Sequence, residues 1–334
     1  MSSTIGSAAA KAVPSINFIG CGGGGINMVR RMLPGYVNRV SYRYIDTSDN
    51  NILPGEDFIS ITKGGSGLKR EKNDNPTTRA IAGYSDEVLG LADINVIVFS
   101  LSGGSGSVSG PLLISEIAVR RKKLVIAIVI ASVQSEKHTS NTLATLRTLH
   151  NITAEDDIYL PIMIFNNAVA GDRFVNDVMP NKMRHLIDIL TTPTFEIDRQ
   201  DRMHFVDVQS VNSDAGHGMR VLYVTANTAG PADDTKAEVW IDADDHVYDS
   251  LLAISTNDAS ARIERLPRAK VSFEGQFLDI KLVSMYAVIG NPSGVFEKLN
   301  DLIQHRLNDF KINSRQDVDP FAPNGTARAS RIIT

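Results

Sequence analysis

The sequence is poor in several features, and each scarcity excludes a class of protein. A single cysteine, Cys21, excludes an intrachain disulfide framework and a multi-cysteine metal site, which agrees with a reducing cytoplasm. No apolar run approaches the length of a membrane span, and residues 1–12 lack the apolar core of a secretion signal. A net charge of -4 gives no overall basic field. We therefore expect a cytoplasmic protein with no membrane partner and no direct contact with nucleic acid.

Short β-rich apolar runs alternate with helical stretches through the first half of the chain. The runs cover residues 15–19, 39–45, 95–101, 124–130 and 159–165. This alternation is typical of an α/β protein with a Rossmann-like parallel sheet covered by helices on both faces. Such sheets bind ligands at the carboxyl ends of their strands, so we expect the functional loops there.

A central helix is expected to follow over residues 171–190, and Pro180 should kink it or start a new helix. After residue 201 the pattern changes to strand-like runs at 220–227, 237–241 and 282–289, with a helix near 259–266. This change predicts a second, smaller α+β domain. The apolar spacing over residues 292–312 predicts a long amphipathic helix.

These patterns divide the chain into six expected segments. The final segment is rich in Pro, Gly, Ala and Ser and is expected to be extended or disordered. The segments are a flexible leader (1–12), a ligand-binding domain (13–170), the central helix and linker (171–200), the α+β domain (201–291), the C-terminal helix (292–314) and the tail (315–334).

Two glycine-rich loops follow predicted strands. The first contains five glycines around Cys21, namely Gly20 and Gly22 to Gly25, and backbone amides of such a turn can hold phosphate. Alone it is weak evidence, because dinucleotide-binding dehydrogenases place a similar motif there. The second, S-G-G-S-G-S-V-S-G-P from Ser102 to Pro111, also leads into a helix. A dehydrogenase normally needs one such loop, whereas a nucleoside triphosphate held from both sides needs two.

The hydroxyl groups of Ser105 and Ser107 are expected to donate to phosphate oxygens. No Walker motif, G-x-x-x-x-G-K-[ST], occurs in the sequence, which disfavours a Walker-type ATPase or a Ras-like fold. Together the two loops resemble the first and fourth nucleotide loops of the tubulin/FtsZ superfamily. The family signature G-G-G-T-G-[ST]-G appears here as Ser102 to Val108 with both end glycines replaced, so the chain resembles a divergent member.

The resemblance implies the tubulin/FtsZ fold and a GTP or GDP ligand. It places Asp46 and Ser48 near the phosphates, Asn166 at the ribose, and Asn27 with Asp177 at the guanine base. A carboxylate that accepts from two guanine donors rejects adenine, which offers no such pair. The full set of implied GTP-binding residues is Gly20, Cys21, Gly22, Gly23, Gly24, Asn27, Asp46, Ser48, Gly65, Ser66, Gly67, Ser102, Gly103, Gly104, Ser105, Gly106, Ser107, Asn166, Asn176 and Asp177.

The resemblance places the third nucleotide loop at residues 64–67, and the charged residues beside it are a less specific signal. Lys69 and Arg70 follow Gly67 and either add charge at the γ-phosphate or form a solvated pair. Mg²⁺ is expected to be bound through the phosphates and water, because the sequence shows no dedicated cage of carboxylates. No metal-ligating residue of the protein is therefore predicted.

The family's catalytic loop, N-x-D-x-x-[DE], aligns with Arg202, His204 and Asp207. Only the last acid is retained, so we expect Asp207 to activate water, with His204 or Asp201 assisting. The alternative is that Asp207 only caps a helix. In the family this loop lies a whole subunit away from its own nucleotide, so the resemblance implies a GTPase whose site is completed by a neighbouring subunit.

The resemblance is greatest to tubulins encoded by large bacteriophages. It implies a polymerising GTPase that forms head-to-tail cytoskeletal filaments and positions phage DNA or its compartment, as phage cargo, in the host cytoplasm. We also expect the C-terminal tail, through Phe321, to bind the neighbouring subunit. The alternatives are a plasmid-segregation or cell-division tubulin homologue, a Rossmann-type dinucleotide-dependent oxidoreductase, or a nucleotide-dependent scaffold that does not hydrolyse GTP.

Overall fold

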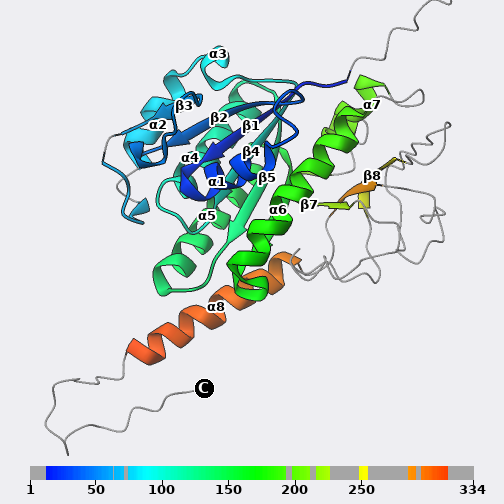
Figure 1. Cartoon of the computed structure of the whole chain (residues 1–334). Coiled ribbons are helices and arrows are strands. Elements are labelled where there is room, and N and C mark those ends of the chain that lie inside the picture. The colour runs from blue at the N-terminus through cyan, green and yellow to red at the C-terminus, as the bar shows by residue number, and fades with distance from the viewer. Residues whose placement is uncertain are drawn as a thin grey trace, which may run out of the picture.

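Runs of valine and isoleucine form the central sheet of the structure. The computed structural model describes residues 13–62, 64–70, 74–192, 198–210, 216–225, 248–254, 285–290 and 295–314. Within these ranges nine strands form one sheet in the order β3-β2-β1-β4-β5-β6-β7-β9-β8 (Figure 1). The strands are β1 (Ile16–Cys21), β2 (Ser41–Asp46), β3 (Phe58–Ser60), β4 (Ile94–Ser100), β5 (Leu124–Ala131), β6 (Tyr159–Asn166), β7 (Gly218–Thr225), β8 (Tyr248–Ile254) and β9 (Met285–Gly290).

The sheet is parallel from β3 to β7, and β9 pairs antiparallel with both β7 and β8. The five strands predicted in the first half are confirmed, each within two residues of its expected bounds. The mostly parallel sheet with flanking helices confirms the predicted fold class. The strands β7, β9 and β8 continue this sheet beyond β6. The division into two domains stays a prediction, and the expected strand at 237–241 and helix at 259–266 lie outside the described residues.

Helices cover both faces of the sheet, and the strand residues alternate between them. Val96 and Val98 of β4 point into a core shared with α1, α6 and α7, whereas Ile97 and Phe99 point into a core shared with α4, α5 and α8. Burial on both faces explains why these strands are continuously apolar. The helices are α1 (Gly22–Met32), α2 (Asp74–Gly83), α3 (Asp86–Leu89), α4 (Gly106–Ile114), α5 (Glu136–Glu155), α6 (Asn167–Thr191), α7 (Arg199–Val206) and α8 (Val295–Ser314).

The long helix α6 corrects one expectation about Pro180. The helical backbone continues across Pro180, and the irregular residue is Gly171, with φ 76° and ψ 157°. A left-handed conformation of this kind is accessible to glycine at little cost, so the chain changes direction there after leaving β6. The break therefore lies near the start of α6 and not at its proline.

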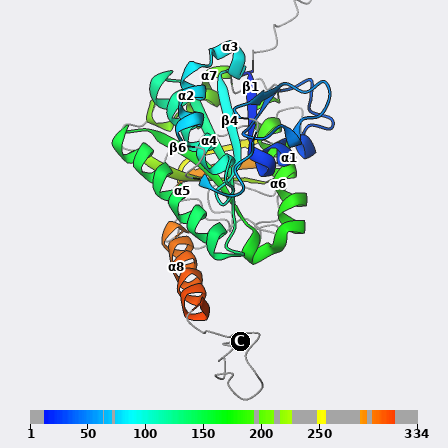
Figure 2. The same cartoon turned by 90° about the vertical axis from the view of Figure 1, so that its left-hand side faces the viewer.

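The helix α8 leaves the body of the protein, as Figures 1 and 2 show. Its first half packs on α5, where Leu299 and Ile303 are buried, whereas Ile312 near its end is exposed. This confirms the predicted long amphipathic helix. Among the described residues, no helix is long and apolar enough to span a membrane.

Candidate functional site

The carboxyl ends of β1, β2 and β4 lead into loops that enclose a cavity of about 540 Å³. These are the loops that the sequence singles out, and they meet because neighbouring parallel strands end at one edge of the sheet. The predicted residues that line the cavity are Cys21, Gly22, Gly23, Gly24, Asp46, Ser48, Gly65, Ser66, Gly67, Ser102, Gly103, Gly104, Ser105 and Gly106. Thr47, Asn50, Asn51, Gly64, Leu68, Ser100 and His138 complete its lining.

Two helices begin at this cavity without a side-chain cap. The N-cap residues of α1 and α4, Cys21 and Ser105, make no capping hydrogen bond with their side chains. The first N–H groups of a helix have no partner within it, and the helix dipole makes that end positive. Both features favour an anion, so two helix ends at one cavity form a site suited to phosphate groups.

Close packing of the loops explains why glycine is required at their contacts. Gly22 has φ +65°, and a Cβ atom there would lie 2.6 Å from the backbone nitrogen of Gly106. A Cβ atom on Gly104 would lie 2.2 Å from Oγ of Ser66 and 2.9 Å from Cα of Leu68. The first loop therefore touches the fourth, and the fourth touches the third, so a larger residue would force them apart.

Asp46 organises the loops from the buried side of the cavity. Its Oδ1 accepts hydrogen bonds from the backbone N–H of Thr47 (2.7 Å) and the hydroxyl of Ser105 (2.5 Å), and its Oδ2 accepts one from the amide of Asn51 (2.7 Å). Asp46 is only 3% exposed. Its carboxylate is thus held by three protein donors and fixes the loop after β2 against the loop after β4.

The structure differs from the expected role of two serine hydroxyls. The hydroxyl of Ser105 donates to Asp46, and the hydroxyl of Ser107, which does not line the cavity, donates to the carbonyl oxygen of Gly103. Phosphate donation by either hydroxyl would compete with these bonds. Backbone amides therefore remain the better candidates for holding phosphate.

The cavity has little positive charge of its own. His138 is the one basic side chain among its described lining residues, and its Nδ1 lies 2.8 Å from Oγ of Ser135. The guanidinium of Arg70 donates to Thr148 on α5 instead, and Lys69 is exposed outside the lining. His138 was not predicted from the sequence, although its place after the carboxyl end of β5 was a usable signal.

No described group of three or more His, Cys, Asp or Glu residues could hold a metal ion. Cys21 is fully buried, and burial raises the pKa of its thiol far above the ordinary value. The thiol therefore stays protonated at neutral pH, so it is not a reactive nucleophile.

The residues expected at the base and ribose lie outside the cavity lining. Asn27 is exposed on α1, Asp177 is exposed on α6 beside the half-buried Asn176, and Asn166 is buried at the end of β6. Arg184 of α6 donates to the carbonyl oxygens of Arg31 and Met32 at the end of α1, so the two helices lie side by side. Gly20 also lies outside the lining, where its missing side chain leaves room for Ile26.

Asp207 lies at a different cavity, of about 260 Å³, at the amino ends of β5 and β6. Lys122, Lys123, Asp156 and Asp157 also line it. Asp207 is half-buried, and its backbone N–H donates to the carbonyl oxygen of Met203 (2.8 Å) at the end of α7.

The segment expected to be a catalytic loop is helical as far as Val206. Asp198 and Asp201 form a capping box that starts α7, so His204 lies inside the helix, where its Nε2 is 2.7 Å from the amide nitrogen of Gln200. The carboxylate of Asp201 accepts from the backbone of Asp198 (3.2 Å). Asp201 thus has a structural role, and His204 is held by its own helix.

Arg202 points into the protein and away from the cavity of Asp207. It is 1% exposed, and its guanidinium donates to the carbonyl oxygens of Ile189 and Thr192 at the end of α6. Burial lowers its pKa, and Asp201 partly offsets this effect. Arg202 therefore caps the carboxyl end of α6 and contributes nothing to the surface that carries Asp207.

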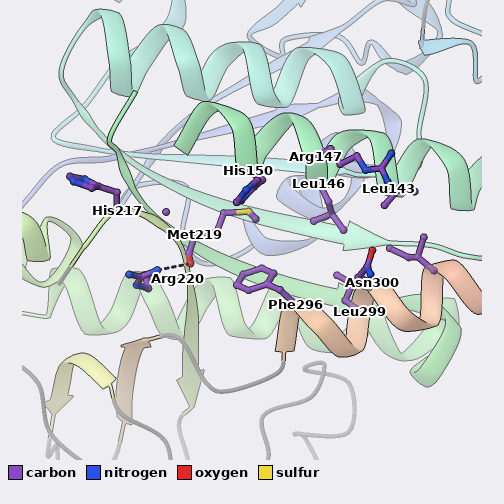
Figure 3. A pocket seen from close by; sticks show the side chains of 12 residues that line it. Leu143, Leu146, Arg147, His150, His217, Met219, Arg220, Phe296, Leu299 and Asn300 are labelled. Atoms are coloured by element: carbon purple, nitrogen blue, oxygen red, sulfur yellow. Dashed lines mark hydrogen bonds between the residues drawn. The ribbon is translucent and has the colours of Figure 1, made fainter. Parts of the chain in front are cut away.

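A third cavity, of about 400 Å³, lies where α8 meets α5 and β7 (Figure 3). Its floor is apolar and includes Leu146, Met219 and Phe296, while Arg147 and His150 lie on the α5 side. None of the predicted nucleotide or catalytic residues lines it.

Comparison with known proteins supports the resemblance. No protein-family model matches the chain. The phage tubulin-like protein of Pseudomonas phage 201phi2-1 is 28% identical over 168 residues, which cover 48% of this chain and 52% of that protein. The phage tubulin-like protein of Pseudomonas phage PhiPA3 is 32% identical over 114 residues, which cover 33% and 36%. The matched region thus spans about half or less of these relatives.

Solved structures match over nearly the whole chain. A protofilament of TubZ from bacteriophage PhiKZ superposes with a TM-score of 0.69 at 19% identity, covering 94% of this chain and 96% of that one. The phage tubulin PhuZ with GDP gives a TM-score of 0.69 at 16% identity, covering 95% of each chain. The chain therefore has the tubulin/FtsZ fold, and its sequence is similar to that of phage tubulin-like proteins.

Proposed function

We propose that this chain binds GTP in the cavity formed by the loops after β1, β2 and β4, and polymerises head to tail into filaments that hydrolyse GTP at each junction. One observation carries the proposal. The cavity enclosed by the loops after β1, β2 and β4, here called the phosphate-type cavity, lies at the carboxyl ends of the parallel strands. The cavity of Asp207 lies at the amino ends of β5 and β6. The two half-sites are therefore at opposite edges of one sheet.

This arrangement suits a filament in which each subunit repeats the orientation of the last. A second copy stacked in the same orientation brings its Asp207 cavity against the phosphate-type cavity of its neighbour. An isologous dimer would instead place like edges together. Head-to-tail assembly is thus the arrangement that joins the two half-sites, and the relatives whose structures match include a protofilament.

The phosphates would be held mainly by backbone amides at Gly22 to Gly24 and Gly103 to Gly106, with Gly65, Ser66 and Gly67 closing over the γ-phosphate. Close packing at Gly22, Gly104 and Gly106 leaves no room for a side chain at these positions. Mg²⁺ would be bound through the phosphates and water near Asp46 and Ser48, and it would offset phosphate charge there. Asn27, Asn176 and Asp177 would contact the nucleoside.

Asp207 would act as the general base on water held between two subunits. Its place at the end of α7, outside any capping box, leaves the carboxylate at the surface of its cavity. His204 is the second candidate, since it lies one turn earlier on the same helix. The likeness to phage tubulin-like proteins supports the positioning of phage DNA or its compartment in the host cytoplasm as the cellular role.

A second function, a GTP-dependent scaffold that does not hydrolyse, is favoured by one observation. Of the three positions aligned with the family's catalytic loop, Arg202 is turned inward and His204 is bonded to Gln200. Asp207 alone retains the family's type of side chain. The two functions agree on GTP binding and filaments and differ on turnover.

The test measures phosphate release at increasing protein concentration, together with filaments seen by electron microscopy. We expect turnover per molecule to rise steeply with concentration. Asp207→Ala should bind GTP and form filaments but lose about 10²-fold or more of the rate. Gly104→Asp should fail to bind GTP, because a side chain there meets Ser66 and Leu68.

Mixing these two inactive variants should restore some turnover, since Asp207 of one then faces the loaded cavity of the other. Turnover independent of concentration would contradict the shared site. Filaments that form with GTP and never release phosphate would support the scaffold instead.

A further inference from the structure

The cavity that contains Asp207 is also lined by two lysines from a distant part of the chain. Lys122 and Lys123 lie in the turn that joins the π-helical segment Ser115–Arg120 to β5. Nζ of Lys123 lies 3.7 Å from Oδ2 of Asp86, so this lysine has an acidic neighbour. Lys122 is exposed, and the described part of the chain offers it no hydrogen bond or ion pair.

The turn that carries Lys122 is firmly anchored on both sides. The guanidinium of Arg121 donates to Glu116 (3.2 Å) and to the carbonyl oxygen of Tyr84 (2.5 Å), and the backbone N–H of Lys123 donates to Ile117 (3.0 Å). Lys122 itself has φ +53°, in the left-handed region that side chains rarely occupy. The neighbouring contacts therefore hold the backbone at Lys122 in this conformation.

Among the described residues, three that are not glycine have a positive φ angle, and each of them lines either the phosphate-type cavity or the cavity of Asp207. Leu68 lines the phosphate-type cavity, and Lys122 and Asp157 line the cavity of Asp207. Backbone strain of this type persists only where the structure holds it, and it collects at functional sites.

The cavity of Asp207 contains lysines, which the phosphate-type cavity lacks. A triphosphate carries several negative charges, and negative charge spreads over the phosphoryl oxygens during hydrolysis. The described lining of the phosphate-type cavity contains Asp46 and no lysine or arginine. The lining of the cavity at the opposite ends of the strands contains Lys122 and Lys123 together with three acids, Asp156, Asp157 and Asp207.

We propose that Lys122 of one subunit binds the γ-phosphate of the GTP held by its neighbour and stabilises the charge that develops there. This rests on the proposed head-to-tail GTPase. The water oxygen forms a bond to the γ-phosphorus as the bond to the β–γ bridging oxygen breaks, and that electron pair leaves on GDP. The water proton passes to Asp207. Lys122 keeps its protons and acts by its charge alone.

The experiment compares Lys122→Asn, Lys122→Arg and the control Lys123→Asn. Asparagine tolerates the left-handed backbone and removes the charge, so the fold should be retained, which thermal unfolding checks. Below the polymerising concentration, all three should bind GTP as the original protein does. In filaments, Lys122→Asn should lose about tenfold or more of the turnover, whereas Lys122→Arg and Lys123→Asn should keep most of it.

A mixture of Lys122→Asn with Gly104→Asp should recover turnover, because Lys122 then acts from the subunit whose own cavity is closed. Weaker GTP binding by isolated Lys122→Asn subunits would place the lysine at its own nucleotide and overturn the proposal. Full turnover by Lys122→Asn filaments, with Asp207→Ala inactive, would overturn the role of Lys122 and leave the shared site standing. Full turnover by Asp207→Ala as well would overturn both.

Discussion

The hydroxyl of Ser105 donates a 2.5 Å hydrogen bond to Oδ1 of Asp46, although the two residues are 59 positions apart. Ser105 belongs to the loop after β4, and Asp46 is the last residue of β2. The same hydroxyl accepts a hydrogen bond from the backbone N–H of Thr47 (3.1 Å). This pair therefore sets the spacing of two loops that the sequence presents as independent motifs.

Asp46→Asn should loosen both loops. An amide replaces one acceptor oxygen by a donor, which would then face Ser105, Thr47 or Asn51, all of them donors to Asp46 in the structure. We expect the free energy of unfolding to fall by about 1–3 kcal/mol and GTP affinity to fall with it. Ser105→Ala removes one of the three donors to Asp46 and the acceptor of the Thr47 N–H, but it sets no donor against another donor, so its effect should be smaller. Denaturant titration and GTP titration measure both, and equal stability of Asp46→Asn and the original protein would contradict the organising role.

Asp177→Ala should weaken GTP binding by about tenfold or more and leave stability nearly unchanged. Asp177 is exposed on α6, so its removal leaves no buried group without a partner. Its proposed contact is to the two donors of the guanine edge, which adenine lacks. The control is Asp172→Ala, the same change in charge on the same helix. Equal affinity of the unmutated protein for ATP and GTP would contradict the assignment to the base.

Arg202→Met should destabilise the fold by removing contacts at the end of α6, without changing any residue that lines the phosphate-type cavity. The guanidinium donates to two carbonyl oxygens at the end of α6, and methionine fills a similar volume but leaves both without these donors. We expect a loss of about 2 kcal/mol in the free energy of unfolding. Arg199→Met on the same helix removes a half-exposed pair with Asp93 and should cost less than about 1 kcal/mol. Denaturation curves of both variants make the comparison, and equal losses would count against the capping role.

The sequence predicts the sheet well because each strand is indicated by the residues of that strand itself. Each of the five strands of the first half lies in a mostly apolar run, which in β4 and β5 is rich in valine and isoleucine, and the two glycine-rich loops follow β1 and β4. The three-residue strand β3 has too few residues to produce a pattern.

The rest of the site depends on contacts between distant segments. The burial of Arg202 could not be predicted, because its partners at the end of α6 exist only once α7 folds back. Likewise, the loop motif suggests that the hydroxyl of Ser105 is free to bind phosphate, but in the structure this hydroxyl donates to Asp46. A motif names the residues of a site, whereas the direction of each side chain is set by tertiary packing.

Glu116→Gln should change how stability depends on pH. Burial of Glu116 opposes its ionisation, but hydrogen bonds and charges from Arg120 and Arg121 outweigh this and hold its pKa below the ordinary value of 4.5. A lowered pKa in the folded state contributes stability above the unfolded pKa, and this contribution is lost as pH falls through the folded pKa.

The variant should therefore be less stable at neutral pH, and its deficit should shrink once pH drops below about 4.5. Urea titrations from neutral to acidic pH measure this difference. Because Arg121 anchors the turn of Lys122, the variant should also turn over GTP more slowly at neutral pH. A constant deficit at every pH would show that the charge of Glu116 contributes nothing.

Truncation after Ser314 tests the tail, whose residues 315–334, including Phe321, lie outside the described part of the chain. The helix α8 ends at Ser314, so the cut should leave its packing on α5 intact. If Phe321 is an aromatic anchor on the neighbouring subunit, its loss should cost about 2 kcal/mol or more per junction. The critical concentration for assembly should then rise about tenfold or more, with GTP binding by isolated subunits unchanged. Phe321→Ala in the full chain should reproduce most of the effect, and sedimentation at several concentrations measures it. Polymerisation of the truncated protein at the original critical concentration would show that the tail makes no contact between subunits.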